Sequence, residues 1–373
     1  MSTSTNETPR YAPLSTLRID LDAITQNYLS LQKRLKRGCD AAAAVKADAY
    51  GLGALEVAAT LHDANCRHFY VADMAEGIAL REGLGGREAQ IYALQGPWGS
   101  ALSDASHHAI TPVLNSLDDV HFWAGTARAE EKRLPAILHL DTGMNRLGLR
   151  PHDVEGLAAD PSPFKALDIR YVMSHLACAD ESAHPMNARQ LGLFQRLCAM
   201  LNLPCPLSFA NSSGIFLGEA YHFDQTRPGA AIYGINPLPD RPNPMQGVVT
   251  LTARILQVRD VDRGESVGYA ADYVLPVAAK LATISAGYAD GLLRSLAGLG
   301  KVYIQGKSCP VVGRISMDAI VADVTGLNVR PGDEAEILGA HQSVDDFART
   351  EKTIGYEILT AMGVRHQRIY VRT

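Results

Sequence analysis

The chain has 373 residues, of which 47% are hydrophobic and 20% are charged, an ordinary composition for a water-soluble globular protein. Its formal net charge is −5, and no run of lysine and arginine creates a basic footprint for nucleic acid. No apolar stretch approaches the roughly 20 residues that a membrane-spanning helix needs. We therefore expect a protein that binds neither nucleic acid nor a membrane.

The six cysteines are scattered and form no C-x-x-C pair, so they are interpreted as reduced packing residues of a cytoplasmic protein. The polar N-terminus, residues 1–13, lacks the apolar segment of a secretory signal. The pair His107-His108 has no second group of metal ligands nearby in the sequence. No metal site is predicted.

From about residue 17 to 235, short β-rich segments alternate with amphipathic helical segments. The periodicity is clearest in two helices, at Ile24, Tyr28, Leu31 and Leu35, with Asp22 as the expected N-cap, and around Phe194. Eight strands, each followed by a helix, predict a parallel (β/α)8 barrel. The predicted strands are 41–45, 68–71, 91–94, 110–113, 136–140, 169–173, 206–209 and 223–226.

Residues 235–245 contain four prolines, too many for a helix or a central strand, and mark the predicted domain boundary. Beyond it the sequence predicts strands at 248–258, 280–285, 301–305, 320–324 and 334–338. The predicted organisation is an N-terminal (β/α)8 barrel over 1–240 and a mostly β domain over 241–373. Within that domain, Gly306-Lys307-Ser308 resembles the end of a P-loop but lacks the earlier glycine and a following helix, so it is interpreted as coincidence.

Catalytic groups of such barrels gather at the C-terminal ends of the strands. Lys46 ends the first predicted strand, in AAAAVKADAYGLG. Burial at the barrel mouth penalises the charged ammonium, which lowers the pKa and favours the free amine. A free amine can form a Schiff base with an aldehyde. Because a lone lysine at a strand end is more often a surface residue, the neighbouring residues must decide between the two interpretations.

The segment AVKADAYGLG resembles the cofactor-lysine motif of the alanine racemase family, with Asp48 and Leu52 differing from its commonest form. Any one segment of this kind is weak evidence, but nine in order along nearly the whole chain are specific. The others are DTGMNRLG at 141–148, SHLACADE at 174–181, NSSG at 211–214, RPGAAIYG at 227–234, VGYAADY at 267–273, SAGYADG at 285–291, GRISMD at 313–318 and TIGYE at 353–357.

The resemblance implies that Lys46 binds pyridoxal 5'-phosphate as an internal aldimine, with the phosphate beyond the last two barrel strands. It implies that Arg227 faces the pyridine nitrogen; because guanidinium keeps its proton, the ring would be a poorer electron sink, which favours racemisation over transamination. His175 would stack against the cofactor ring. The remaining expected cofactor contacts are Tyr50, Asn211, Ser212, Gly229, Ala230 and Tyr356.

By the same resemblance, Tyr269 of a second subunit is the base opposite Lys46, with Lys46 serving D-alanine and Tyr269 serving L-alanine. Arg227 and His175 would form the relay that activates the phenol. Because Tyr269 and Lys46 lie in different predicted domains, a head-to-tail homodimer with shared active sites is expected. Arg146 and the backbone of Met317 would bind the substrate carboxylate, and Tyr288 would line the entrance.

One position departs from the family pattern. Where many members have a lysine that becomes carbamylated and supports the arginine equivalent to Arg146, this chain has His139. Imidazole cannot form that stable carbamate. We therefore expect Arg146 to be held by a bound anion such as chloride or by a direct polar side-chain contact.

Three alternatives compete with this interpretation. A basic-amino-acid decarboxylase on this architecture would carry a glycine-triplet phosphate loop, which is missing from the sequence. A non-catalytic pyridoxal-phosphate carrier would lack the β domain and Tyr269. A broad-specificity amino-acid racemase differs only in the size of its pocket and stays open, as does the choice between supplying D-alanine for cell-wall synthesis and degrading it. The sequence predicts an alanine racemase acting by two-base proton transfer.

Overall fold

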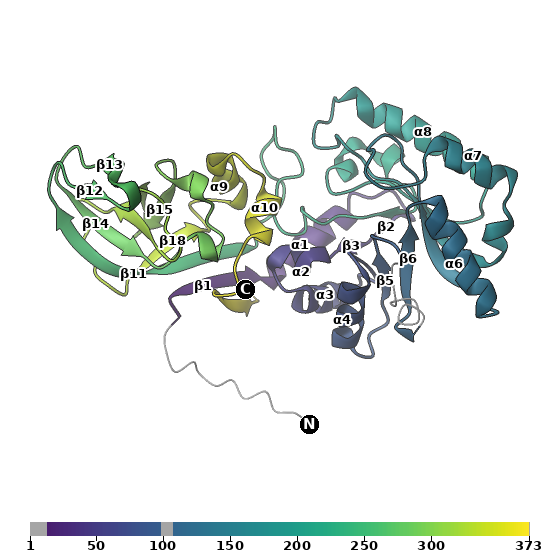
Figure 1. Ribbon diagram of the computed structural model, residues 1–373, viewed down its shortest axis with the longest axis horizontal. Coiled ribbons are helices and arrows are strands. Elements are labelled where there is room, and N and C mark those ends of the chain that lie inside the picture. Colours follow the sequence, from purple (N-terminus) through teal and green to yellow (C-terminus); the bar gives the residue numbers. More distant parts are fainter. Residues whose placement is uncertain (1–12, 98–106, 373) are drawn as a thin grey trace. The chain divides into compact units, whose positions relative to one another are not determined.

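The computed structural model describes residues 13–97 and 107–372 (Figure 1). It divides into two compact units, one spanning Ala23–Gln246 and one made of the chain up to Asp22 together with Gly247 onward. The barrel unit thus ends at Gln246 rather than at residue 240. The N-terminal segment, assigned to the barrel from sequence, belongs instead to the β unit, because its strand pairs there.

The strands of the barrel unit are all parallel. The first predicted strand is split into two halves: β2 pairs with β10 and β3 pairs with β4, which closes the barrel. All eight predicted strands are confirmed, with ends shifted by one to two residues in most cases. They are β2 (Asp40–Ala41), β3 (Ala43–Ala44), β4 (His68–Val71), β5 (Gln90–Ala93), β6 (Ile110–Leu114), β7 (Leu134–His139), β8 (Leu167–Met173), β9 (Leu207–Ser208) and β10 (Gln225–Thr226).

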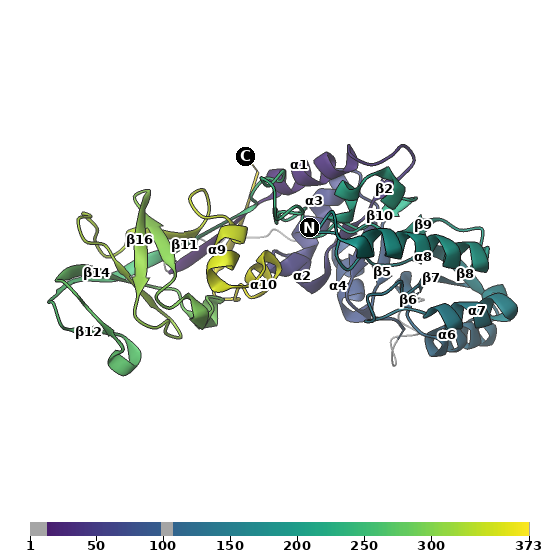
Figure 2. The same ribbon diagram turned by 90° about the horizontal axis from the view of Figure 1, so that it is seen from above.

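Helices cover the outside of these strands (Figures 1 and 2). The described helices of this part are α1 (Leu21–Gln32), α2 (Lys46–Gly51), α3 (Ala54–Asp63), α4 (Met74–Leu84), α6 (Leu117–Ala129), α7 (Pro151–Ala159) and α8 (Pro185–Leu201).

The predicted helix periodicity is confirmed in α1, where Ile24, Tyr28 and Leu31 are fully buried. Asp22, expected as its N-cap, instead lies inside the first turn. The prediction of a helix after every strand was wrong after β9, which is followed by two short 3-10 turns, and after β10, which is followed by tight backbone turns.

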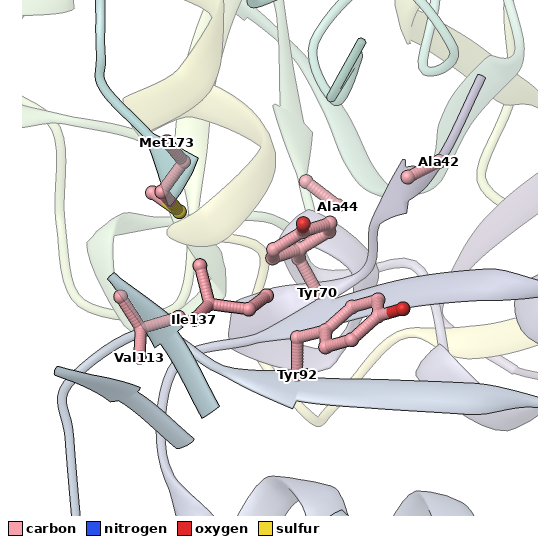
Figure 3. Packing of buried hydrophobic residues seen from close by; sticks show 7 residues of the cluster. All are labelled: Ala42, Ala44, Tyr70, Tyr92, Val113, Ile137 and Met173. Carbon is pink, nitrogen blue, oxygen red and sulfur yellow. The ribbon is translucent and has the colours of Figure 1, made fainter. Parts of the chain in front are cut away.

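The interior of the barrel is a packed core (Figure 3). Side chains from successive strands meet there, with Tyr70 and Tyr92 packed at 4.7 Å between ring centroids. The Tyr70 hydroxyl donates to Gln225 Oε1 at 2.7 Å and so links β4 to β10 across the interior. The cluster consists of Ala42, Ala44, Tyr70, Tyr92, Val113, Ile137 and Met173.

The second unit is built on one long strand, β11, whose first half alternates buried and half-buried residues. It pairs with β1 and β18 and also with β14. The strands are β1 (Ser15–Asp20), β11 (Val249–Val261), β12 (Ser266–Val267), β13 (Tyr273–Val274), β14 (Ala279–Ile284), β15 (Lys301–Ile304), β16 (Lys307–Val312), β17 (Ile320–Asp323), β18 (Glu334–Leu338) and β19 (Gln367–Val371), with helices α9 (Val344–Glu351) and α10 (Gly355–Thr360).

The five strands predicted beyond the domain boundary are confirmed, whereas β1, β12, β13, β16 and β19 were not predicted. Lys307 and Ser308 begin β16, and Gln305 and Gly306 form the turn before it with positive φ angles of 54° and 74°. This segment is therefore a β-hairpin and not a phosphate loop. None of the described helices combines the length and apolar character needed to cross a bilayer.

Truncating the core should destabilise the barrel specifically. Ile137→Ala removes a fully buried side chain and should lower the free energy of unfolding by about 2–5 kcal/mol, because the cavity left behind adds to the lost apolar burial. Both tryptophans, at positions 98 and 123, fall between 23 and 246, so tryptophan fluorescence in a urea titration reports on this unit. Met200→Ala, at a largely exposed position on α8, is the control; an equal loss in the two variants would contradict this assignment of the core.

Candidate active site

The parallel strands bring their C-terminal ends to one mouth of the barrel. Six of these ends are followed within a few residues by a polar side chain suited to chemistry or binding. In strand order these are Lys46 after β3, Asn115 after β6, His139 at the end of β7, His175 after β8, Ser212 after β9 and Arg227 after β10. The predicted barrel residues are therefore gathered at one place.

Lys46 is followed by an unusual backbone turn. Ala47, Asp48, Ala49 and Tyr50 all have left-handed helical angles, with φ between 52° and 58°. This conformation costs about 1–2 kcal/mol per non-glycine residue, so surrounding contacts must hold it. Asp48 helps, because its Oδ1 accepts the N–H of Ala54 and its carbonyl accepts the N–H of Gly53. A strained segment held this firmly beside a half-buried lysine indicates a functional site.

The charge state of Lys46 is shifted toward the free amine. Burial lowers the pKa of its amine, the positive charge of Arg146 lowers it further, and the carboxylate of Glu76 opposes both effects. The sequence predicted that burial lowers the pKa of the Lys46 amine, and the surroundings of Lys46 in the folded chain have this effect. In its neutral form a lysine amine is a nucleophile and a proton acceptor.

Arg227 is a buried guanidinium that forms no ion pair with any residue in the described parts of the chain. It donates to Ser208 Oγ and to the Ser174 carbonyl, each at 2.5 Å, and lies 5.8 Å from the centre of the Tyr70 ring. Burial lowers its pKa, yet a guanidinium stays protonated near neutral pH. An uncompensated buried charge is costly, so its presence points to a role toward a ligand.

His175 is held neutral beside it. Burial and the charges of Arg227 and Arg146 place the pKa of His175 well below its ordinary value. Arg227 Nη2 lies 3.5 Å from His175 Nδ1. Because guanidinium can only donate, Nδ1 must be the acceptor, and the proton of the neutral ring sits on Nε2. His175 therefore offers an N–H donor on its far side.

A second group of residues is suited to an anion. Ser212 Oγ accepts the N–H groups of Gly229 at 3.0 Å and Ala231 at 3.2 Å, which fills its acceptor positions and leaves its O–H to donate. A Cβ at Gly229 would lie 2.6 Å from the Tyr50 hydroxyl, so only glycine permits this approach. The Gly229 N–H could donate to an anion only by giving up its hydrogen bond to Ser212 Oγ.

Asn211 and Ala230, which were also predicted to contact the cofactor, make hydrogen bonds within their own backbone turns. The side chain of Asn211 is engaged in its own turn, where Oδ1 accepts the N–H of Gly214 at 2.9 Å. Ala230 is buried in the tight turn that follows β10, and its carbonyl accepts the N–H groups of Tyr233 and Ile235. Both residues thus shape the backbone beside Ser212 and Gly229.

Arg146 projects from a loop that is tied firmly to the strand ends. Asp141 Oδ1 accepts three consecutive backbone N–H groups, from residues 143 to 145, at 2.9–3.1 Å. The N–H of Leu149 donates to the His139 carbonyl at 2.7 Å, and that of Gly148 donates to the Asn115 carbonyl at 3.1 Å. The loop is fixed, while the Arg146 guanidinium itself is exposed and forms no hydrogen bond or ion pair within the described residues.

His139, the residue that departs from the family pattern, is paired with Asn115. The amide nitrogen of Asn115 donates to the carbonyls of Leu94 and Val113, so its Oδ1 must accept from His139 Nδ1, at 2.7 Å. Burial, with the nearby positive charges of Arg227 and Arg146, lowers the pKa of His139 to about 3. His139 is therefore neutral at physiological pH. The structure holds no direct polar partner for Arg146 among the described residues, which leaves the bound anion as the surviving hypothesis of the two.

The other predicted residues belong to the β unit. Tyr269 is 69% exposed at the tip of the β12–β13 hairpin, where Ala270 and Ala271 have positive φ angles. Tyr288, after β14, and Met317, after β16, are exposed on two loops that are joined by a hydrogen bond from the N–H of Ala289 to the Met317 carbonyl at 3.1 Å. Tyr356 is exposed on α10. An exposed tyrosine on a strained tip indicates a surface that meets a ligand or another chain.

Two residues of the site were missed from sequence. Asn115 follows β6 and Glu76 lies in the first turn of α4, three residues after its N-cap Asp73. The spacing Asp73-x-x-Glu76 is that of an ordinary capping box, which hides any further role. A polar residue directly after a predicted barrel strand was the available signal for Asn115. No cluster of three or more potential metal ligands occurs among the described residues.

The residues at the mouth fit a phosphate-bearing aldehyde. A nucleophilic lysine amine, an unpaired buried guanidinium and a hydroxyl donor beside Gly229 provide partners for a carbonyl carbon, a ring nitrogen and an anion respectively. This fold and site define a barrel protein with a half-buried lysine amine in a mouth rich in basic groups.

Comparisons with known proteins identify the family. Residues 19–237 match the family "Alanine racemase, N-terminal domain", and residues 248–370 match "Alanine racemase, C-terminal domain". The chain is 48% identical over 358 residues to a catabolic alanine racemase of Mesorhizobium japonicum, covering 95% of this chain and 93% of the relative. It is 45% identical to the alanine racemase of Rhodospirillum rubrum, covering 95% of each. The chain belongs to the alanine racemase family.

Solved structures agree. The alanine racemase of Bartonella henselae with covalently bound pyridoxal phosphate superposes with a TM-score of 0.92 at 40% identity, over 96% of this chain and 100% of that chain. The enzyme of Streptomyces lavendulae also gives a TM-score of 0.92, at 31% identity, over 97% and 98%. The predicted fold class, a barrel followed by a mostly β domain, is confirmed.

The neutral, buried state of His139 predicts an acid-sensitive barrel. The pKa of His139 is about 3 in the folded chain, and that of an unfolded histidine is about 6.5. At pH values between these two, the imidazole binds a proton in the unfolded chain but not in the folded one. Stability should therefore fall as pH is lowered through this window. His139→Gln keeps a donor toward Asn115 and should lose less stability on acidification, as measured by urea unfolding at pH 7 and pH 5. His107→Gln, at an exposed position, is the control, and wild-type pH dependence in His139→Gln would refute the prediction.

Proposed function

We propose that this chain is an alanine racemase that interconverts L-alanine and D-alanine. The observation that carries the proposal is the half-buried Lys46 amine at the barrel mouth, with its pKa lowered, facing a set of basic groups that includes a guanidinium without an anionic partner. Membership of the family, at 48% identity over most of the chain, supports the choice of substrate. The relatives from Mesorhizobium japonicum and Rhodospirillum rubrum are both named for alanine.

Pyridoxal phosphate fits these residues, and when bound it supplies a conjugated ring that withdraws electrons from the α-carbon of an amino acid. Lys46 would hold its aldehyde carbon and Arg227 would donate to its ring nitrogen. Ser212, Gly229 and Tyr50 would hold its phosphate beyond the last two strands, a common phosphate position in this fold. His175 would pack against the ring. Tyr356, Asn211 and Ala230 are the remaining proposed contacts.

Two bases on opposite faces would move the α-proton. Lys46 Nζ would accept it from D-alanine, and the Tyr269 hydroxyl oxygen would accept it from L-alanine. An isolated phenol has a pKa of about 10 and needs help to act near neutral pH. The relay provides it, because Arg227 donates toward His175 Nδ1 and the His175 Nε2–H is then free to donate to the Tyr269 oxygen, which stabilises the phenolate.

The substrate carboxylate would be bound by Arg146 and by the backbone N–H of Met317, with Tyr288 at the entrance. Arg146 suits this role because its guanidinium forms no hydrogen bond or ion pair within the described residues and its loop is rigid. A small anion such as chloride would support Arg146 from the other side. A broad-specificity racemase would use the same groups, and the named relatives favour alanine over it.

The active site is proposed to be shared between two subunits of a head-to-tail homodimer. Lys46 and Tyr269 lie in different units, and Tyr269 is displayed, largely exposed, on a hairpin tip whose backbone is strained. We also propose a cytoplasmic location, supported by six unpaired cysteines, of which Cys39, Cys66 and Cys309 are buried packing residues.

The reaction is tested directly by incubating the purified protein with L-alanine and measuring D-alanine, with and without added pyridoxal phosphate. Borohydride reduction of the loaded protein followed by peptide mapping should label Lys46, and Lys46→Ala should lose both the label and activity by several orders of magnitude. Labelling of another lysine, or turnover by Lys46→Ala, would reject the assignment.

Subunit sharing predicts complementation. Tyr269→Phe should lose exchange of the α-proton from L-alanine while retaining some from D-alanine. When Tyr269→Phe and Lys46→Ala chains are unfolded and refolded together, half of the dimers are mixed, and one of the two sites in each is intact. About a quarter of wild-type activity should therefore return. If both bases came from one chain, mixing would restore no activity.

A further inference from the structure

Glu76 makes two hydrogen bonds that connect neighbouring strand ends at the site. Its Oε1 accepts the N–H of Ala47, the residue directly after Lys46, and its Oε2 accepts the N–H of Ala72, just beyond β4; both distances are 2.8 Å. The carboxylate therefore joins the backbone after β3 to the backbone after β4. The bond to Ala47 also satisfies the first backbone N–H of the left-handed turn.

This is not the arrangement that the local sequence predicts. In a capping box the Glu76 side chain would accept the N–H of the N-cap residue, Asp73. Instead Asp73 caps the helix alone, through its Oδ1 and the N–H of Glu76 at 3.0 Å, while the Glu76 carboxylate turns away toward Ala72 and Ala47. Both carboxylate oxygens are acceptors here, so the amide of a glutamine would place its NH2 group against one of two backbone N–H groups.

Glu76 is also the acidic group that acts on Lys46. The charged and titratable groups around the amine come from separate elements: Glu76 from α4, Arg146 from the loop after β7, and His175 from the end of β8. Two other carboxylates of the mouth bind their own loops instead: Asp141 Oδ1 accepts three N–H groups of its loop, and Asp48 Oδ1 accepts the N–H of Ala54. Of these carboxylates, Glu76 is the one whose charge raises the pKa of the Lys46 amine.

We propose that Glu76 is a positioning residue of the lysine site, whose carboxylate fixes the Lys46–Ala47 peptide to the end of β4 and acts as the counter-charge of the Lys46 amine. The proposal rests on the proposed function in taking Lys46 as the reactive group. Glu76 itself has no direct contact with cofactor or substrate in this role. It sets where the amine stands and how readily it gives up its proton.

The counter-charge is tested on the full-length protein after the cofactor has been removed. Competitive acetylation with acetic anhydride across a pH series, followed by peptide mapping, gives the pH at half-maximal reactivity of Lys46. Glu76→Gln should shift this midpoint downward relative to wild type, because removal of the carboxylate charge leaves Arg146 and burial unopposed. Asp73→Asn is the matched control: it removes one negative charge from the same helix N-terminus, keeps the cap acceptor and should leave the midpoint unchanged.

An unchanged or raised midpoint in a folded Glu76→Gln protein would overturn the counter-charge role, as would an equal shift in Asp73→Asn. The positional role is tested with Glu76→Asp, which keeps the charge but is too short to reach both N–H groups. Amide hydrogen exchange of the peptide spanning 46–52 should become faster in this variant, and unchanged protection would overturn that role. Acetylation is measured on the protein without cofactor and so reports on the amine independently of cofactor binding, whereas failure of the proposed function would appear separately, as the lack of a borohydride label on Lys46.

Discussion

The structure depends on how residues 40–44 close the barrel. The two halves of this strand pair with β10 on one side and β4 on the other, with backbone hydrogen bonds from Ala42 to Thr226 and from Val45 to Tyr70 of 2.9 and 2.8 Å. Because all the strands are parallel, closure brings residues from distant parts of the sequence to one rim. The segment that closes the barrel is also the one that ends in Lys46. Fold stability and the position of the reactive amine therefore depend on the same few hydrogen bonds.

The rim is electrostatically unbalanced. Beyond the effect of burial, the charge of Arg146 lowers the pKa of Lys46, and the charges of Arg227, Arg146 and Lys46 lower the pKa of His175. Such repulsion costs stability and is relieved by anionic groups, so it favours the binding of a phosphate or a carboxylate at this rim. Burial, together with the same positive charges, keeps His139 and His175 neutral. The contact of Arg227 with His175 Nδ1 then fixes the His175 tautomer on which the proposed relay depends.

The sequence predicts the barrel well because its strands are apolar and bounded by helices with clear periodicity. It fails where tertiary contacts replace local pattern. β1 and β19 are half-polar segments: β1 becomes a strand by pairing with β11 and β19, and β19, at the edge of the sheet, by pairing with β1. β16 carries Pro310 within a hairpin. At the site, family resemblance places Lys46 and Arg227, whereas Glu76 and Asn115 act through hydrogen bonds to backbone groups far along the chain. No spacing rule reveals a bond from residue 76 to residue 47.

The pairing of β1 with β19 has a consequence for synthesis on the ribosome. Thr16 lies in register with Gln367, so a strand translated before the barrel is covered on its outer edge only by a strand translated after the barrel. The barrel, from Ala23 to Gln246, is contiguous and can form while the remainder is still being made. The β unit cannot form at that stage, because β1 must pair with β19, which is made after the barrel. Closing the long stretch of chain between these two strands also costs conformational entropy. A ribosome that stops early would release a finished barrel with an uncovered N-terminal strand, a ready template for misassembly with another chain.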